Sequence, residues 1–433
     1  MRRGADEAQD PRPRSAVSTG VGMAGLAGIL VWTILARHWS LDGPGAALAS
    51  LFACGVPMIL WSVLVDKVHR SPTTGIDWAG PPRPLAETLP ISLLKIAGLW
   101  ITWAGMACLY WAGRWYWEGS YVFAMQVFDA FALPLFLLSI PYVVWLDRRL
   151  LEPRDGTWHF AVSILGRRAD ANREAVADYL RCWAIKGFFL AFMVSVLPGN
   201  WQVVIAPEVS QIVAGPVALS MWLAHTTFMI DVSFATIGYL LTMKPLDAHI
   251  RSANPYAAAW VAALLCYPPF AIIGPGLPID YFQGSGEWTY WLGGSPLLLA
   301  LYAVPLAFLH CFYVWATIAF GIRFSNLTHR GILTHGPYRW TKHPASLSKN
   351  LFWWVAALPF LAVSGSPVDA VRNTAMLAAV SLIYYWRSKT EERHLMADPA
   401  YRDYAAWMER NAPLPRLVRR IRGRGPEPIV AAE

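Results

Sequence analysis

Long apolar stretches that are almost free of charge constrain this chain more than any other feature. Of its 433 residues, 56% are hydrophobic and only 15% are charged, whereas a soluble domain carries about 25% charged residues. Several stretches approach or exceed the roughly 20 residues that an α-helix needs to cross a bilayer, which predicts an all-α, polytopic integral membrane protein with about ten transmembrane helices. The predicted spans cover residues 17–36, 44–65, 90–112, 121–145, 181–198, 218–242, 256–274, 294–321, 345–363 and 370–387.

The uneven distribution of Lys and Arg predicts the orientation of these spans, because cytoplasmic loops of membrane proteins are enriched in both residues. With the N-terminus inside, 29 of the 36 Lys and Arg side chains fall in predicted inner loops and tails, and three fall in predicted outer loops. Both termini are therefore expected in the cytoplasm. The formal charge of +8 then follows from topology and favours anionic lipid surfaces, so no nucleic-acid partner is predicted.

The chain divides into three regions by composition. Residues 1–15 are polar and rich in Pro and Arg, which predicts a disordered cytoplasmic tail. Residues 16–290 form a multi-span region to which the sequence assigns no role, and its last part is rich in Gly and Pro, which interrupt helices. Residues 291–433 hold the last three predicted spans and the most distinctive polar motifs. We expect a multi-pass protein of a bacterial inner membrane.

Two carboxyl residues, Asp129 and Asp231, lie within predicted spans. An ionisable side chain there is costly, so each is a candidate functional residue. A carboxyl group that hydrogen-bonds to a neighbouring helix is the alternative explanation for both. The five cysteines show neither a metal-ligand spacing nor a disulfide framework, and no metal site is predicted.

Two polar clusters near the C-terminus favour a ligand site. The first, G-P-Y-R-W-T-K-H-P, runs from Gly336 to Pro344, and the second, R-S-K-T-E-E-R-H-L, begins at Arg387 just past an apolar segment. The predicted topology places both at one membrane surface. Their carboxylates, basic groups and aromatic rings suit a small charged molecule. Gly336 predicts a turn, Pro344 predicts a helix start, and Arg387 and Glu391 share one helical face because they are four residues apart.

Together the clusters resemble the isoprenylcysteine carboxyl methyltransferase family, which is similar in this region to phospholipid methyltransferases. The family pattern is G-P-Y, then R-H-P-x-Y-x-G at a helix start, then E-E-x-x-L after a further helix, then a Tyr-rich segment. The chain matches it with Gly336-Pro337-Tyr338, Lys342-His343-Pro344, Glu391-Glu392 with Leu395, and Tyr401 and Tyr404. The resemblance covers about residues 300–433 and implies a membrane methyltransferase that uses S-adenosylmethionine (SAM) as methyl donor.

Carried over residue by residue, the resemblance implies a cofactor site and an acceptor site. Arg387 falls at the position that faces the methyl acceptor. Glu392, His343 and His394 are candidate general bases for an amine or hydroxyl acceptor. A carboxylate acceptor is already ionised and needs no base. The implied cofactor contacts are Arg330, Gly331, Ile332, Leu333, Tyr338, His343, Pro344, Ala345, Ser346 and Glu391.

The chain departs from the family pattern at three positions. Lys342 replaces an Arg and loses its bidentate fork. Ser346 stands where the pattern has Tyr, and Ser348 stands where it has Gly. A side chain at the latter position would obstruct a close approach of the backbone to the cofactor.

The expected reaction is carboxyl O-methylation of an isoprenylcysteine-type acceptor, with lipid or lipidated molecules and the bilayer as partners. Methyl transfer from SAM is an in-line displacement, so the protein would contribute positioning and desolvation. Three alternatives remain. They are a phospholipid or other lipid N-methyltransferase, an oxidoreductase of the sterol-reductase type with a nicotinamide cofactor, and a transporter or binding protein that retains the helical module without catalysis.

Overall fold

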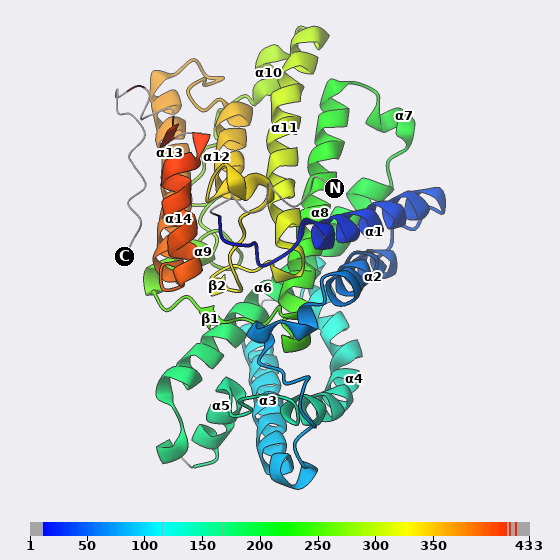
Figure 1. The fold of residues 1–433 in the computed structure, drawn as a ribbon. Helices are drawn as coiled ribbons and strands as arrows, with labels where there is room; N and C mark the ends of the chain where they lie inside the picture. The colour runs from blue at the N-terminus through cyan, green and yellow to red at the C-terminus, as the bar shows by residue number, and fades with distance from the viewer. Residues whose placement is uncertain (1–11, 115, 167, 414, 417–420, 422–433) are drawn as a thin grey trace, which may run out of the picture.

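The computed structural model describes residues 12–114, 116–166, 168–413, 415–416 and 421, and it is mostly helical (Figure 1). Seven helices are long and apolar enough to cross a membrane, which confirms a multi-pass, all-α architecture at this level. They are α1 (Thr19–His38), α2 (Pro44–Leu60, continued by a π-helical turn to Val65), α3 (Leu85–Gly113), α4 (Val122–Asp147), α6 (Arg173–Ile205), α8 (Pro216–Leu240) and α11 (Pro296–Phe320, continued to Arg323).

The other three predicted spans differ from the expected form. The prediction of one helix over 256–274 is wrong for its second half, since α9 (Ala257–Leu264) ends early. Two consecutive prolines follow shortly after α9, and proline lacks the N–H that a helix needs. Helix α12 (Pro344–Ala357) has 14 residues, fewer than the roughly 20 of a full span. Helix α13 (Pro367–Leu395) has 29 residues but is not among the seven apolar helices.

Short elements complete the described part of the chain. Strands β1 (Ser252–Ala253) and β2 (Thr328–His329) pair antiparallel and tie two loops together. The remaining α-helices are α5 (Gly156–Ile164), α7 (Val209–Ile212), α10 (Trp288–Leu292) and α14 (Pro399–Asn411).

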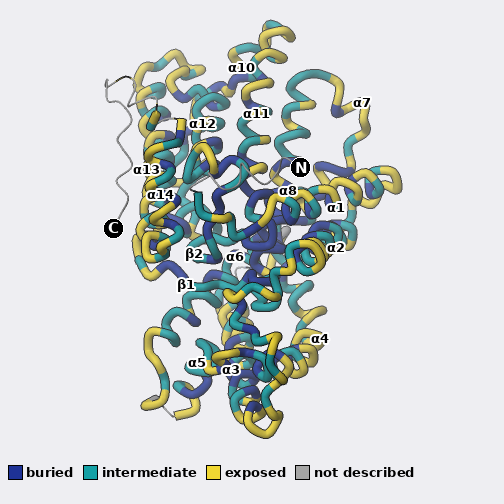
Figure 2. Tube along the Cα trace, viewed as in Figure 1, coloured by how far each residue is buried: buried dark blue, intermediate teal, exposed yellow. Residues whose placement is uncertain are grey.

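Helices α6 and α8 form the central pair of the fold. Helices α3, α4 and α5 gather at one end of the molecule, and α8 and α10–α13 gather at the other (Figure 1). The buried residues run along α6 and α8 between these ends (Figure 2). Phe189 of α6 and Tyr239 of α8 are almost fully buried, and their rings stack with centroids 5.4 Å apart. Helix α11 packs on α8, so the loops at the ends of α8 and α11 are held side by side.

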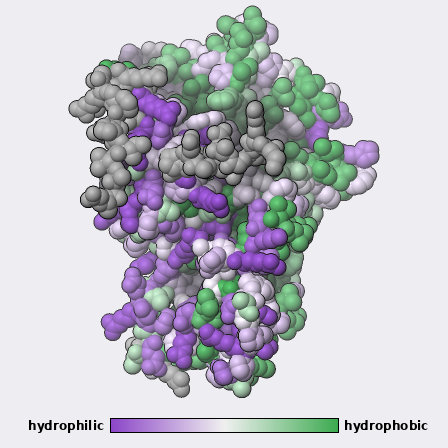
Figure 3. All heavy atoms as spheres, viewed as in Figure 1, coloured by the Kyte–Doolittle hydropathy of each residue, from purple (hydrophilic) through white to green (hydrophobic). Residues whose placement is uncertain are grey.

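The outer face of α11 suits a lipid environment. Leu297, Leu301, Val304 and Phe308 recur at helical spacing, and all four are 61–68% exposed. Groups of hydrophobic residues lie at the top of this end of the molecule in the space-filling view (Figure 3). An exposed apolar face of this kind is typical of a membrane or protein contact, and a bilayer would cover it.

Candidate functional site

The segment from Gly321 to Pro344 connects α11 to α12 and carries the first predicted cluster. Gly321 and Gly336 both have positive φ angles, +51° and +58°, which glycine adopts without steric cost. The chain makes a 3-10 turn at Gly336–Arg339, and α12 begins at Pro344. The turn and the helix start predicted from the sequence are therefore confirmed.

Arg330 holds this segment against the end of α8. Its side chain is buried, and it donates to carbonyl oxygens of Gly238 and Leu241, at the last turn of α8. The final carbonyls of a helix lack partners within the helix and favour a cation. Further bonds reach the carbonyl oxygens of Ala248, Ile322 and Phe324. All five N–H donors are thus engaged by backbone carbonyls, so this guanidinium ties the loop to the end of α8, and the cofactor contact predicted for Arg330 stays a prediction.

The N-terminal segment lies along the same loop. The backbone N–H of Ala16 donates to the carbonyl oxygen of Ile332 at 2.8 Å, and the Ser15 hydroxyl lies 2.7 Å from His335 Nδ1. Thr334 donates its hydroxyl to the carbonyl oxygen of Pro13 at 2.9 Å. Residues 12–15 of the predicted disordered tail therefore lie against this loop, and residues 1–11 lie outside the described part of the chain.

Two adjoining pockets surround the predicted residues. The loop pocket lies between the 320–343 segment, the end of α13 and α14, and the inter-helix pocket lies among α8, α9, α11, α12 and α13. Counting the open solvent at their mouths, their volumes are about 550 and 1100 Å³. Residues that line both pockets are Phe320, Ser325, Thr328, Tyr338, Lys342, His343 and Glu391.

The structure brings the predicted cofactor residues together around these two pockets. Arg330, Gly331, Ile332 and Leu333 line the loop pocket; Pro344, Ala345 and Ser346 line the inter-helix pocket; Tyr338, His343 and Glu391 line both. Arg387 lines the inter-helix pocket, on the same face of α13 as Glu391, as its spacing predicted. Glu392 is absent from the lining of both pockets.

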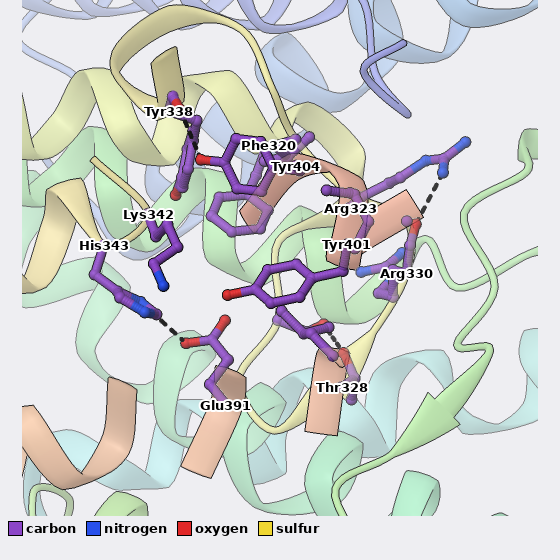
Figure 4. A pocket seen from close by; sticks show the side chains of 15 residues that line it. Phe320, Arg323, Thr328, Arg330, Tyr338, Lys342, His343, Glu391, Tyr401 and Tyr404 are labelled. Carbon is purple, nitrogen blue, oxygen red and sulfur yellow. Dashed lines mark hydrogen bonds and ion pairs between the residues drawn. The ribbon is translucent and has the colours of Figure 1, made fainter. Parts of the chain in front are cut away.

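A tyrosine hydroxyl without a partner points into the loop pocket. Tyr401 is buried, and its hydroxyl oxygen has no hydrogen-bond partner within the described residues. Burial and the nearby acidic side chains raise the pKa of Tyr401, so the hydroxyl keeps its proton and remains a donor. In Figure 4 this hydroxyl, the Lys342 ammonium and the Glu391 carboxylate converge on one space. Tyr404, one turn away, instead donates to the carbonyl oxygen of Tyr338 at 2.6 Å.

The two adjacent glutamates have different surroundings. Glu392 lies 2.9 Å from His343 Nε2, 3.1 Å from Lys342 Nζ and 3.2 Å from Lys389 Nζ. Burial raises the pKa of Glu392, but the hydrogen bonds from His343 and Lys342 outweigh burial and lower it to about 2. Glu392 thus pairs with Lys342 and His343 outside both pockets, and its role as a general base stays a prediction. The Glu391 side chain is 52% exposed, and His343 Nδ1 lies 3.8 Å from its carboxylate.

Charged and polar groups line the inter-helix pocket. Arg387 stacks on the rings of Tyr267 and Tyr384 and donates to Asn326 Oδ1 at 3.3 Å. In the same pocket, the Asp231 carboxylate accepts hydrogen bonds from two hydroxyls of α11. Asp129, the other carboxyl within a predicted span, is exposed on α4 and lines neither pocket.

Ser348 does not obstruct the site. Its side chain is buried and lines neither pocket. Its hydroxyl donates to the carbonyl oxygen of Pro344 at 2.9 Å, one turn back in α12. The obstruction expected from replacing Gly at this position is therefore not seen.

Comparison of the chain with protein-family models, with curated proteins and with solved structures gave no match.

Proposed function

We propose that this protein is a SAM-dependent methyltransferase that acts on a membrane-embedded acceptor. The observation that carries the proposal is the convergence of Lys342, Glu391 and the Tyr401 hydroxyl on the loop pocket, where this hydroxyl has no hydrogen-bond partner among the described residues. A buried donor without a partner costs free energy unless a ligand satisfies it. The loop pocket meets the inter-helix pocket at Tyr338 and His343, so a cofactor and an acceptor would meet there.

The groups in the loop pocket suit the two ends of SAM. Glu391 would hold the cationic ammonium and sulfonium, because its carboxylate is partly exposed and only weakly paired. Lys342 and Tyr401 would donate to the SAM carboxylate. Phe320 and Tyr338 provide an aromatic wall for the adenine, with their ring centroids 5.5 Å apart in a T-shaped arrangement.

The acceptor would enter the inter-helix pocket and place its reactive group near Arg387. The proposed reaction is carboxyl O-methylation of an isoprenylcysteine-type acceptor, in which the ionised carboxylate attacks the methyl carbon and the sulfonium leaves as the thioether. Such an acceptor needs no base.

The proposal includes both termini in the cytoplasm and a bacterial inner membrane as location. The count of ten spans is not kept, because α9 has only eight residues. Support comes from the distribution of Lys and Arg along the sequence. Helices α12 and α13 would pair with α11 to complete the membrane part of the acceptor pocket.

Calorimetric titration of SAM into the purified protein tests the proposal. Loss of a charged contact typically costs about 2–5 kcal/mol, and Glu391 is half exposed, so Glu391→Ala should weaken SAM binding by roughly tenfold. Glu409→Ala is the matched control, because Glu409 is exposed on α14 and lines neither pocket. No SAM binding by the parent, or equal affinity in the folded Glu391 variant, would contradict the proposed site.

A further inference from the structure

Asp231 is a buried carboxylate for which the proposed methyl transfer has so far no use. It lies in α8 with 6% of its surface exposed. The hydroxyls of Tyr313 and Thr317 donate to its two carboxyl oxygens. Each carboxylate oxygen has two lone pairs, so both can accept a further bond. Because an ionisable group within an apolar helix is costly, its place on the pocket wall favours a role in binding.

Other groups that line the same pocket as Asp231 are donors. Arg387 and Lys349 line the pocket, and Lys349 Nζ lies 4.2 Å from the centroid of the Tyr313 ring. The Nδ2 atom of Asn326, which also lines the pocket, is buried and has no hydrogen-bond partner in the described chain. Within the described ranges, no ion pair joins Asp231, Arg387 or Lys349 to a group of opposite charge. The pocket therefore presents an unpaired negative group and unpaired positive groups to the same ligand.

We propose that Asp231 is a specificity-determining contact for the methyl acceptor. The acceptor would carry an anionic group that binds at Arg387, Lys349 and Asn326, and beside it a hydroxyl or amine that donates to Asp231. A carboxylate only accepts hydrogen bonds, so a head group without a donor would desolvate its remaining lone pairs and leave them without a partner. Sites built to bind a donor reject analogues that lack it.

The inference rests on the proposed function where it assigns this pocket to the acceptor. It also gives residues 16–290 a role, because α8 of that region supplies the carboxylate while α11, α12 and α13 supply the other polar groups. The segment that resembles methyltransferases would thus depend on the preceding region for its choice of acceptor.

Direct binding of four matched amphiphiles tests the contact without SAM. The probes are dodecanoate, 3-hydroxydodecanoate, 3-aminododecanoate and 3-methoxydodecanoate, titrated into the full chain in neutral detergent micelles. A hydrogen bond to a carboxylate corresponds to roughly tenfold in affinity. The hydroxy or the amino probe should therefore bind about tenfold more tightly than dodecanoate and the methoxy probe, and the tighter of the two identifies the donor. Equal affinities for all four would overturn the proposal.

Variants show whether Asp231 is the source of that preference. Asp231→Asn should reduce it to about twofold while dodecanoate still binds, since the groups that hold the carboxylate remain. Thr317→Val, a milder change, should reduce it in part, and Asp129→Asn should leave it unchanged. A preference retained in Asp231→Asn would overturn the inference. Because SAM is absent, a donor preference in a protein that fails to bind SAM would contradict the proposed function and leave this contact standing.

Discussion

Two tyrosines one turn apart in α14 differ in what their hydroxyls contact, and the difference separates ligand binding from stability. Tyr404 donates to the carbonyl oxygen of Tyr338, whereas the Tyr401 hydroxyl has no partner in the described chain. Tyr404→Phe should therefore lower the free energy of unfolding by about 1 kcal/mol. Tyr401→Phe should leave stability unchanged or slightly raised and weaken SAM binding by roughly fivefold.

Thermal unfolding in detergent and calorimetry with SAM check this pair of variants. Each tyrosine serves as the control for the other, because both are buried in the same helix. If Tyr401→Phe destabilised the protein as much as Tyr404→Phe and left SAM affinity intact, the hydroxyl would belong to the packing of α14 and the loop pocket would lose its main support.

Variants of Arg387 distinguish the proposed acceptor site from the proposed cofactor site. It lines the inter-helix pocket and is absent from the lining of the loop pocket. Arg387→Ala should thus leave SAM affinity nearly intact and reduce turnover. Arg387→Lys should restore turnover only in part, because Lys lacks the planar fork that binds a carboxylate in two places and stacks on aromatic rings. Full turnover in the Lys variant would reduce Arg387 to an interfacial anchor.

A buried histidine near the end of helix α13 makes the stability of the folded protein depend on pH. His394 lines the inter-helix pocket, and its Nε2 lies 2.9 Å from the Ser252 hydroxyl of β1. Burial, with a contribution from His329, lowers the pKa of His394 to about 4 from an ordinary value of 6.5. The folded state therefore favours the neutral ring. Its contribution to stability is complete above pH 6.5 and is lost as the pH falls from about 6.5 to about 4.

The melting temperature should accordingly fall between pH 6.5 and 4 in the parent protein. His249, in the loop that follows α8, has a pKa lowered to about 4 by burial and contributes with the same sign. His394→Gln keeps a polar group near Ser252 but cannot take up the proton, so its decline should be shallower. Identical pH profiles for parent and variant would show that His394 does not contribute.

The secondary structure near the site was predictable where a single residue's own backbone preference determines it. Pro344 marks the start of α12 and Gly336 marks a turn because proline and glycine restrict or widen the backbone choices of their own residues. The early end of α9 could also have been read from its two following prolines. The role of Arg330 could not, because the carbonyls that it binds come from α8, some 90 residues earlier in the sequence.

The polar groups of the inter-helix pocket show the same limit. Asp231 was a candidate from its place in an apolar span, but the sequence could not separate it from Asp129. Only packing does so, since one carboxyl lines the pocket and the other is exposed on α4. Tyr401 was visible as part of a Tyr-rich segment, whereas its free hydroxyl depends on the docking of α14 against the loop.

For the whole molecule, the proposed topology fixes which side of the membrane carries the site. With both ends cytoplasmic and residues 275–293 outside, a reporter fused after Gly284 should face outward and one fused after Glu433 should face the cytoplasm. The physical reason is the excess of Lys and Arg in the predicted inner loops. Reporters on the same side would contradict this topology, and a fusion after residue 180 provides a third, cytoplasmic reference.

Transfer of a labelled methyl group to a lipid acceptor tests the proposed SAM-dependent methyltransferase activity itself. The purified protein would be incubated with methyl-labelled SAM and a membrane lipid extract, and the lipid-soluble product would be separated and treated with mild base. The account predicts a labelled product whose methyl group base releases as methanol, as expected for a carboxyl ester, and a rate strongly reduced in Glu391→Ala and Tyr401→Phe. No label in the lipid fraction beyond that of heat-denatured protein, in a preparation that remains folded, would contradict it.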